Sequence, residues 1–164
     1  MSGLELTIRD PAEMQRLGRL LSGVLSAGDV VALDGPLGAG KSVLARAVIQ
    51  SLCPAEDDIP SPTFTLVQTY EPEGGMPLMH FDLYRLEAPE EALELGIEDA
   101  FSDAVCLVEW AERLGPLLPR QALRLSIEPS DDGAGHEQRH VAISGGARWH
   151  PVFAELREAF VTPL

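Results

Sequence analysis

The start of the chain carries a strand-like pattern of hydrophobic residues followed by a helix-like one. Residues 4–8 alternate apolar and polar side chains, which predicts a short strand with one buried face. The next segment, Asp10-Pro11-Ala12-Glu13, supplies an N-cap, a proline in the first turn and a carboxylate three residues after the cap, so a helix begins there. Apolar residues then recur at helical spacing until Gly28, which is placed to end the run; they are Met14, Leu17, Leu20, Leu21, Val24 and Leu25. We therefore expect a helix whose apolar face packs on a sheet.

A second strand and a second helix flank a stretch rich in glycine. Residues 30–33, Val-Val-Ala-Leu, form a β-branched run that leads directly into the glycines. One apolar helical face follows, made of Val43, Leu44, Ala47, Val48 and Leu52. Polar residues bounded by prolines then predict a loop over 54–60, a strand pattern covers 64–70, and paired glycines favour a turn over 71–77. The order is strand, glycine loop, helix, loop, strand.

Two further apolar runs each end in an acidic residue. Residues 78–81 are followed by Asp82, and residues 104–108 are followed by Glu109. Such short apolar runs are typical of strands buried inside a sheet. Between them, residues 89–95 begin with proline, end before a glycine, and favour a short helix.

The C-terminal part changes to an antiparallel pattern. Residues 122–128 and 139–144 alternate as two strands around a polar loop at 130–137, and residues 151–160 are expected to form a closing helix. Because strands and helices alternate before this point, we predict a single α/β domain over residues 1–164. Its expected architecture is a three-layer α/β/α fold of the P-loop NTPase type, with a mainly parallel sheet plus C-terminal antiparallel strands.

The composition narrows the choice of partners and compartment. A chain of 164 residues can bury a substantial core without disulfides or metal ions. The net charge of -14 repels phosphate backbones, so direct binding to nucleic acid is disfavoured; the acidity serves either solubility or docking on a basic partner. Cys53 and Cys106 lack zinc or redox spacing. No signal-peptide pattern and no apolar run of membrane-spanning length are present, so we expect a cytoplasmic protein that makes no membrane contact.

The glycine stretch carries the strongest chemical signal. Gly35-Pro-Leu-Gly-Ala-Gly-Lys41-Ser42 is a complete phosphate-binding loop between a predicted strand and a predicted helix. In such a loop backbone N–H groups surround the phosphates, the lysine neutralises the terminal phosphate, and the serine hydroxyl binds Mg²⁺. Lys41 is the only lysine in the chain. We expect the nucleotide to lie against Gly35, Leu37, Gly38, Ala39, Gly40, Lys41, Ser42 and Val43.

A bound Mg²⁺ needs acidic ligands, and Asp82 and Glu109 are the two candidates. Both follow apolar strands, and the carboxyl ends of parallel strands meet on the side of the sheet where ligands bind. The alternative is that either residue merely ends a strand, in a chain with 26 carboxylates. His80, inside the strand before Asp82, is read as a hydrogen-bonded structural residue with no assigned role. Trp110 is either a packing residue or a wall of the nucleotide site.

The expected nucleotide is ATP. GTPases that recognise guanine carry an Asn-Lys-x-Asp motif, whereas this chain has no asparagine and no second lysine. Phosphoryl transfer depends mainly on positioning and charge neutralisation, so an incomplete site should bind ATP well and hydrolyse it slowly. Two other functions use the same loop. One is a small-molecule kinase, which usually has an arginine-bearing lid that this sequence lacks; the other is a nucleotide-gated binding module with negligible turnover.

The motifs as a set resemble one family. The phosphate loop, Ser61-Pro-Thr-Phe-Thr-Leu-Val67, His80-Phe-Asp-Leu-Tyr-Arg-Leu86 and Cys106-Leu-Val-Glu-Trp110 are similar in order and spacing to the TsaE family, formerly YjeE. That family comprises small bacterial ATPases needed to make N6-threonylcarbamoyladenosine (t6A) at position 37 of tRNA. The resemblance implies a mobile loop over residues 61–65 near the γ-phosphate. The resemblance implies phosphate contact for Lys41, Mg²⁺ binding for Ser42, Asp82 and Glu109, and phosphate sensing for Thr63. We therefore expect Lys41, Asp82, Glu109 and Thr63 to be the catalytic residues, and we count Trp110 among the expected nucleotide contacts.

The resemblance also implies partners. Family members act with TsaD, which transfers the threonylcarbamoyl group, and with TsaB, its scaffold, and ATP hydrolysis is thought to reset their complex; tRNA is then met only indirectly. Three positions depart from the family pattern. Pro36 replaces a usual acidic residue, Ser42 replaces a usual threonine, and Met14 stands where a threonine often lies near the adenine. Beyond residue 129 no specific match is found.

Overall fold

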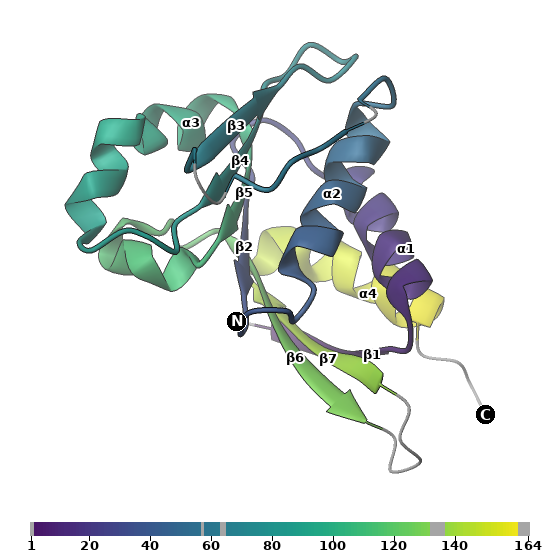
Figure 1. Cartoon of the computed structure of the whole chain (residues 1–164). Coiled ribbons are helices and arrows are strands. Elements are labelled where there is room, and N and C mark those ends of the chain that lie inside the picture. The colour runs from purple at the N-terminus through teal and green to yellow at the C-terminus, as the bar shows by residue number, and fades with distance from the viewer. Residues whose placement is uncertain (1, 57, 63–64, 132–136, 161–164) are drawn as a thin grey trace.

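The computed structural model describes residues 2–56, 58–62, 65–131 and 137–160. At its centre lies a seven-stranded sheet in the order β1-β7-β6-β2-β5-β4-β3 (Figure 1). The strands are β1 (Ser2–Ile8), β2 (Val30–Asp34), β3 (Val67–Tyr70), β4 (Leu78–Asp82), β5 (Val105–Glu109), β6 (Leu123–Asp131) and β7 (Glu137–Gly145). β4, β5, β2 and β6 pair in parallel, and antiparallel pairing adds β7 and β1 on one side and β3 on the other. The predicted parallel centre with C-terminal antiparallel strands is confirmed.

Helices cover both faces of this sheet, as the three-layer prediction requires. α1 (Pro11–Ser22), α2 (Lys41–Leu52) and α4 (His150–Phe160) lie on one face, and η1 (Pro89–Leu95), α3 (Ile97–Asp103) and η2 (Ala111–Leu117) lie on the other (Figure 1). Successive side chains along a strand point to opposite faces of the sheet, so one strand contributes buried residues to both helical layers. In β5, Val105 and Leu107 pack with the first set of helices, whereas Cys106 and Val108 pack with the second.

The predicted helix start at Asp10 is confirmed, but its end is not. The Asp10 carboxylate accepts a hydrogen bond from the Glu13 N–H at 2.8 Å, and the Glu13 carboxylate accepts one from the Arg9 N–H at 2.8 Å. The helix stops at Ser22, well before Gly28. Val24 and Leu25 still pack on the core after the helix has ended. The apolar character of these two positions therefore reflects their burial and does not indicate helical structure.

Other boundaries differ for local reasons. The strand expected over 64–70 begins at Val67, because Leu66 has a left-handed φ of 68° that an extended strand does not tolerate; Phe64 lies outside the described residues. Ser130 and Glu137, expected in a loop, belong to β6 and β7. α3, η2 and the short η3 (Ala147–Trp149) were not predicted. The short helix at 89–95 is present as a 3-10 helix followed by a left-handed Gly96.

The parallel pairing brings three acidic residues to one end of the sheet. In the β4–β5 register Asp82 lies beside Glu109, and in the β2–β5 register Leu33 lies beside Glu109, one residue before Asp34. We call this the loop end, defined by Asp34, Asp82 and Glu109, because the glycine-rich segment leaves β2 there. The opposite end, where β2 begins, we call the far end.

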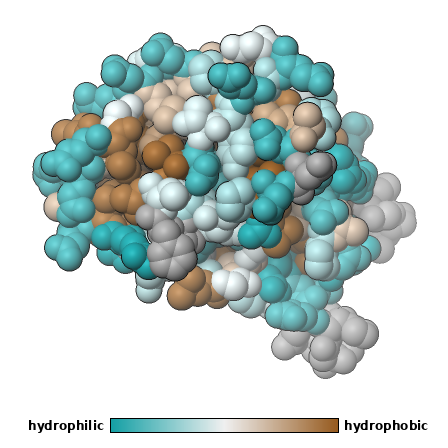
Figure 2. All heavy atoms as spheres, turned by 45° about the horizontal axis from the view of Figure 1, so that its top comes forward, coloured by the Kyte–Doolittle hydropathy of each residue, from teal (hydrophilic) through white to brown (hydrophobic). Residues whose placement is uncertain are grey.

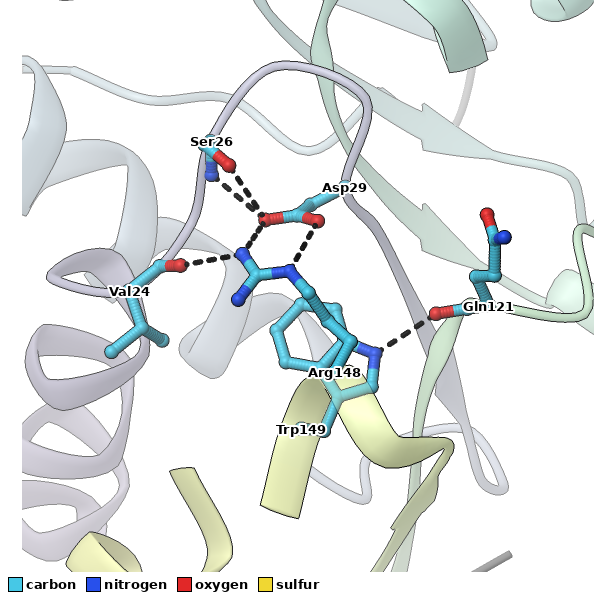
Figure 3. A network of polar contacts seen from close by, with 6 residues as sticks. All are labelled: Val24, Ser26, Asp29, Gln121, Arg148 and Trp149. Carbon is cyan, nitrogen blue, oxygen red and sulfur yellow. Dashed lines mark hydrogen bonds and ion pairs between the residues drawn. The ribbon is translucent and has the colours of Figure 1, made fainter. Parts of the chain in front are cut away.

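At the far end, polar side chains tie the C-terminal segment to the start of β2 (Figure 3). The Arg148 guanidinium donates to both oxygens of Asp29, at 2.6 and 3.4 Å, and to the Val24 carbonyl at 3.1 Å. Asp29 also accepts the Ser26 N–H at 2.8 Å, and the Trp149 indole donates to the Gln121 carbonyl at 2.9 Å. The donors and acceptors in this network pair with one another, so the network stabilises the attachment of the C-terminal segment to the start of β2.

One face of the molecule is largely hydrophilic (Figure 2). Figure 2 shows hydrophilic side chains over most of the face it draws, with hydrophobic ones gathered toward the left, the side of α3 in Figure 1. Within the described parts of the chain, no helix is both long and apolar enough to cross a membrane.

Candidate functional site

The glycine-rich segment forms a tight loop between β2 and α2. Gly40 is the N-cap of α2 with φ of 114°, which a residue with a side chain adopts only with strain. At Gly35 a Cβ atom would meet the Ile127 carbonyl oxygen at 2.2 Å, so a larger residue does not fit there. The N-terminal end of α2 thereby faces the loop, and its unpaired backbone N–H groups favour an anion.

Lys41 is held inside this loop. Its Nζ donates to the Gly35 carbonyl and, at 3.4 Å, to the Pro36 carbonyl, and it lies 3.8 Å from the centre of the Trp110 ring. Only 5% of the residue is exposed. Burial lowers the pKa of the Lys41 ammonium, although the Glu109 and Glu112 carboxylates act against that shift. The contacts on Nζ are neutral carbonyls and a π face, so an anionic phosphate is a stronger partner for it.

The backbone of Trp110 directs its ring toward Lys41. Trp110 has φ of 58° and ψ of 42°, a left-handed conformation that is uncommon for a bulky residue. Its N–H donates to the Leu33 carbonyl at 3.2 Å, and its ring packs against Tyr84 with centroids 4.9 Å apart. A strained residue held by strand and ring contacts at a cavity is typical of a functional position.

Asp82 and Glu109 are neighbours, as the predicted strand ends require. Both are buried, with exposures of 5% and 2%. Glu109 Oε1 accepts the Ser42 hydroxyl at 3.1 Å, and its Oε2 lies 2.6 Å from His80 Nε2. Asp82 Oδ1 accepts the Tyr84 N–H at 3.1 Å. The structure therefore links the candidate metal-binding serine directly to one of the two candidate carboxylates.

These groups surround one cavity of about 250 Å³ at the loop end. Its lining includes predicted nucleotide and metal residues from the loop, from α2 and from the ends of β4 and β5: Leu37, Gly38, Ala39, Gly40, Lys41, Ser42, Val43, Asp82, Glu109 and Trp110, together with Arg46. Gly35 contributes through its carbonyl contact with Lys41. Thr63, the predicted phosphate sensor, lies outside the described residues.

The oxygen atoms of Ser42, Asp82 and Glu109 fit Mg²⁺. Among the described residues no three His, Cys, Asp or Glu side chains lie close enough to form a metal cage by themselves. Mg²⁺ does not need one, because it usually keeps several waters and takes one or two carboxylates plus phosphate oxygens. The hydroxyl and the carboxylates all line the cavity that also holds Lys41. The donor set is hard and oxygen-based, as this ion prefers.

A second carboxylate pair lies beside the loop and was missed by the sequence reasoning. Burial, followed by a hydrogen bond with Glu112 and the charge of Glu112, raises the pKa of Asp34 to about 7. Arg124 and Lys41 act in the opposite direction. Asp34 ends β2 as Asp82 ends β4, so the strand-end signal was present; its pairing with a residue from η2 was not readable from spacing.

A second cavity, of about 300 Å³, lies on the other side of the loop. It shares Ala39, Gly40 and Val43 with the first cavity, and it is also lined by Ile8, Arg9, Asp10, Pro11, Met14, Glu137, Gln138 and Arg139. Met14, noted for its family position near the adenine, thus borders this space, and its Cε lies 3.3 Å from where a Gly40 Cβ would stand.

Arg139 connects the previously unassigned C-terminal hairpin to the phosphate loop. Its Nε donates to the Ala39 carbonyl at 2.7 Å and its Nη2 to the Gly38 carbonyl at 3.3 Å. These bonds hold two loop carbonyls toward the hairpin. A contact across 100 residues has no local sequence signal, which explains why it was not predicted.

Comparison with known proteins gives concordant results. The family model described as "Threonylcarbamoyl adenosine biosynthesis protein TsaE" matches residues 8–141. The chain is 40% identical to a Streptomyces coelicolor protein over 83% of this chain and 93% of that protein. It is 33% identical to a Bacillus subtilis protein over 95% of each chain. Both carry the name tRNA threonylcarbamoyladenosine biosynthesis protein TsaE. The crystal structure of B. subtilis YdiB is similar with a TM-score of 0.74 and 27% identity, over 96% of this chain and 95% of that one.

Proposed function

Because the chain belongs to the TsaE family, whose model matches residues 8–141, we propose that it is an Mg²⁺-dependent ATPase required for forming t6A at adenosine 37 of tRNA. The observation that carries this proposal is the single cavity that gathers Lys41, Ser42, Asp82 and Glu109 at the loop end. A phosphate-binding loop with a lysine, a hydroxyl and two carboxylates has the parts that phosphoryl transfer uses. The names of the relatives supply the pathway.

The residues divide the work as follows. Loop N–H groups and the start of α2 bind the phosphates, while the Lys41 ammonium exchanges its carbonyl contacts for phosphate oxygens. Ser42, Asp82 and Glu109 hold Mg²⁺, which, when bound, neutralises charge on the phosphate oxygens. Trp110 forms a wall of the cavity and limits the access of water to Lys41.

The base is assigned to the second cavity. It adjoins the phosphate loop through Gly40 and Val43, and its volume of about 300 Å³ suits a flat heterocycle. Ile8, Pro11 and Met14 provide apolar contacts. The nucleotide proposed is ATP, because the chain lacks the asparagine and second lysine of the guanine-reading motif.

Partners follow from the pathway. We assign TsaD and TsaB as the proteins with which this ATPase acts, and its own contact with tRNA as indirect. The net charge of -14 supports that division, because an acidic surface repels a phosphate backbone.

The decisive experiment measures phosphate release from Mg-ATP by the purified chain, alone and with TsaB and TsaD from the same organism. We expect slow hydrolysis alone and strong stimulation by the two partners, with both activities lost in Lys41→Ala. Hydrolysis that the partners leave unchanged would contradict the assigned partnership. Appearance of the γ-phosphate on a metabolite would indicate a kinase instead, and partner binding that depends on ATP without turnover would indicate a binding module.

A further inference from the structure

His80 lies directly behind the acidic pair of the loop end. Its ring is fully buried, at 0% exposure, and its Nε2 is 2.6 Å from Glu109 Oε2. Residues two apart on a strand share a face, so His80 and Asp82 both project from the same side of β4. Asp82 is beside Glu109 in the register, which puts His80 one step deeper along the sheet.

The surroundings assign the ring hydrogen of His80 to Nε2. An ionised carboxylate only accepts hydrogen bonds, so the short contact with Glu109 needs a donor on the ring. Nδ1 is buried and has no hydrogen-bond partner among the described residues. A buried N–H without a partner is rarer and more costly than an unused lone pair, so Nδ1 carries no hydrogen.

The two oxygens of Glu109 have partners of different kinds. Oε1 accepts from Ser42, a residue that we assign to Mg²⁺, so this hydrogen bond and the metal use the same hydroxyl group. Oε2 accepts from His80, whose ring is fixed in β4 and is not assigned to the metal or the nucleotide. The bond from His80 uses no group that is assigned to the metal, so it is compatible with a loaded site. The Ser42 hydroxyl can also ligate the metal through an oxygen lone pair while it donates its hydrogen to Oε1.

We propose that His80 is a positioning residue: its Nε2–H holds Oε2 of Glu109 and thereby keeps Oε1 directed at the Mg²⁺ and phosphate region. Hydrogen-bonded partners of ligating carboxylates fix ligand orientation in this way. The bond itself rests on geometry alone, whereas its consequence for metal binding rests on the proposed function. His80 makes no contact with the nucleotide in this assignment, so it acts only through Glu109.

The first test reads the bond in the native protein. Long-range ¹H–¹⁵N correlation spectra of the ¹⁵N-labelled chain report which ring nitrogen of each histidine carries hydrogen, and His80→Gln identifies the His80 signals by their loss. We expect the Nε2–H tautomer for His80, with a shift of its Nε2 resonance in Glu109→Gln. A ring that carries its hydrogen on Nδ1, or that does not respond to Glu109→Gln, overturns the inference.

The second test measures the consequence. Mn²⁺, used as a paramagnetic substitute for Mg²⁺, is titrated into the ADP-loaded protein and followed by electron paramagnetic resonance. We expect His80→Phe to weaken Mn²⁺ binding about 10–100-fold, the usual loss when such a supporting partner is removed. His80→Gln should restore most of the affinity, because its amide nitrogen reaches about as far as Nε2, while the shorter His80→Asn should not. ADP affinity without metal should stay unchanged in all three.

A matched control comes from the surface. His140 Nε2 lies 3.4 Å from Glu5 Oε1, but these side chains are 42% and 74% exposed. His140→Gln should leave Mn²⁺ affinity unchanged. Equal Mn²⁺ affinity in the native protein, His80→Gln and His80→Asn overturns the inference even if His80→Phe does not fold. A native protein that binds no ADP overturns the proposed function instead, and the spectra still decide the bond.

Discussion

Both ends of the sheet contain an arginine or a lysine near carboxylates, but the direct partners of that cation differ. They include a carboxylate at the far end and are neutral groups at the loop end. At the far end, Arg148 meets both oxygens of Asp29 and a carbonyl, and the side chain of Arg148 is 46% exposed (Figure 3). At the loop end, Lys41 is buried against neutral carbonyls and a ring, and Asp34 is held at a raised pKa. Protein contacts compensate the charges at the far end, whereas at the loop end the direct contacts of the Lys41 ammonium are neutral, which is why we propose a ligand there.

Cavity size alone would favour the far end over the loop end. A hollow of about 480 Å³ lies at the far end, bordered by Asp29, Arg148 and Trp149, and it is larger than either cavity beside the phosphate loop. Asp29 and Arg148 on its border are paired with each other, so these two groups offer a ligand little electrostatic gain; Arg120 also lines the hollow. Our proposal of the loop end as the functional end therefore relies on buried charges that protein contacts leave poorly compensated, and not on volume.

The largest effect is expected from a substitution that disrupts the loop end and leaves the far end intact. Lys41→Ala should weaken ATP binding by about 100-fold or more, since a charged hydrogen bond to phosphate contributes up to ~3 kcal/mol. The unliganded protein should lose little stability, because its buried ammonium is only partly compensated. Isothermal titration calorimetry and urea unfolding check the two halves. Lys41→Arg should also fail, since a planar guanidinium does not replace a point charge in a tight loop.

The next largest effect is expected from substitutions at the loop end that lower ATP hydrolysis but leave ATP binding largely intact. Asp82→Ala and Glu109→Ala should each lower Mg²⁺-dependent hydrolysis by about 100-fold or more, because the loss of a proposed metal ligand should cost at least as much as the loss of its supporting partner, while ATP affinity changes little. Steady-state hydrolysis against Mg²⁺ concentration, with calorimetry for ATP, measures this. Full activity in either variant would remove that residue from the proposed metal site.

A smaller effect is expected when the far end is broken. Arg148→Ala removes the partner of Asp29 and should cost about 1–2 kcal/mol of unfolding free energy, given one charge-assisted pair that is partly exposed. ATP affinity should be unchanged, the reverse of the Lys41→Ala result. Urea unfolding and calorimetry on the same preparation decide it. If Arg148→Ala weakened ATP binding instead, the two ends would not be independent.

The smallest effect concerns Asp34 and pH. Its pKa is about 7 in the folded chain against an ordinary 3.8, so between these values the folded state binds more protons than the unfolded one. Stability therefore falls as pH rises from about 4 to about 7. Asp34→Asn should remove this fall and raise the melting temperature at pH 8 by about 2–4 °C, the shift for ~1 kcal/mol in a chain of this size. Thermal melts of the variant and the native chain at pH 5 and pH 8 measure this. If the melting temperature of the variant changed between pH 5 and pH 8 as much as that of the native chain, the prediction would be contradicted.

Features formed by residues close together in the sequence, or fixed by the strand order, could be predicted from the sequence. The phosphate loop places Lys41 and Ser42 within one turn of α2, so spacing was sufficient to bring them together. Asp82 and Glu109 were predicted to meet because parallel strands end together, and the register confirms that they do. The prediction that the first helix continues to Leu25 was wrong, since burial of that residue does not require helix.

The missed contacts join distant segments through side-chain direction. Glu112 reaches Asp34 from a 3-10 helix that no pattern predicted, and Arg139 reaches the loop from a hairpin strand. His80 was correctly recognised as a hydrogen-bonded residue of a strand, but its partner was not. Helix and strand periodicity states which face is buried; it does not state which polar atom meets which across the sheet.

The positions of the two tryptophans give the chain a built-in pair of optical probes. Trp110 lies over Lys41 in the cavity at the loop end, so a bound phosphate that draws the ammonium away should change its emission. Trp149 is fully buried at the far end, and its emission should change only when the chain unfolds. Replacing either one with phenylalanine would leave a single reporter, of ligand or of folding, without any added dye.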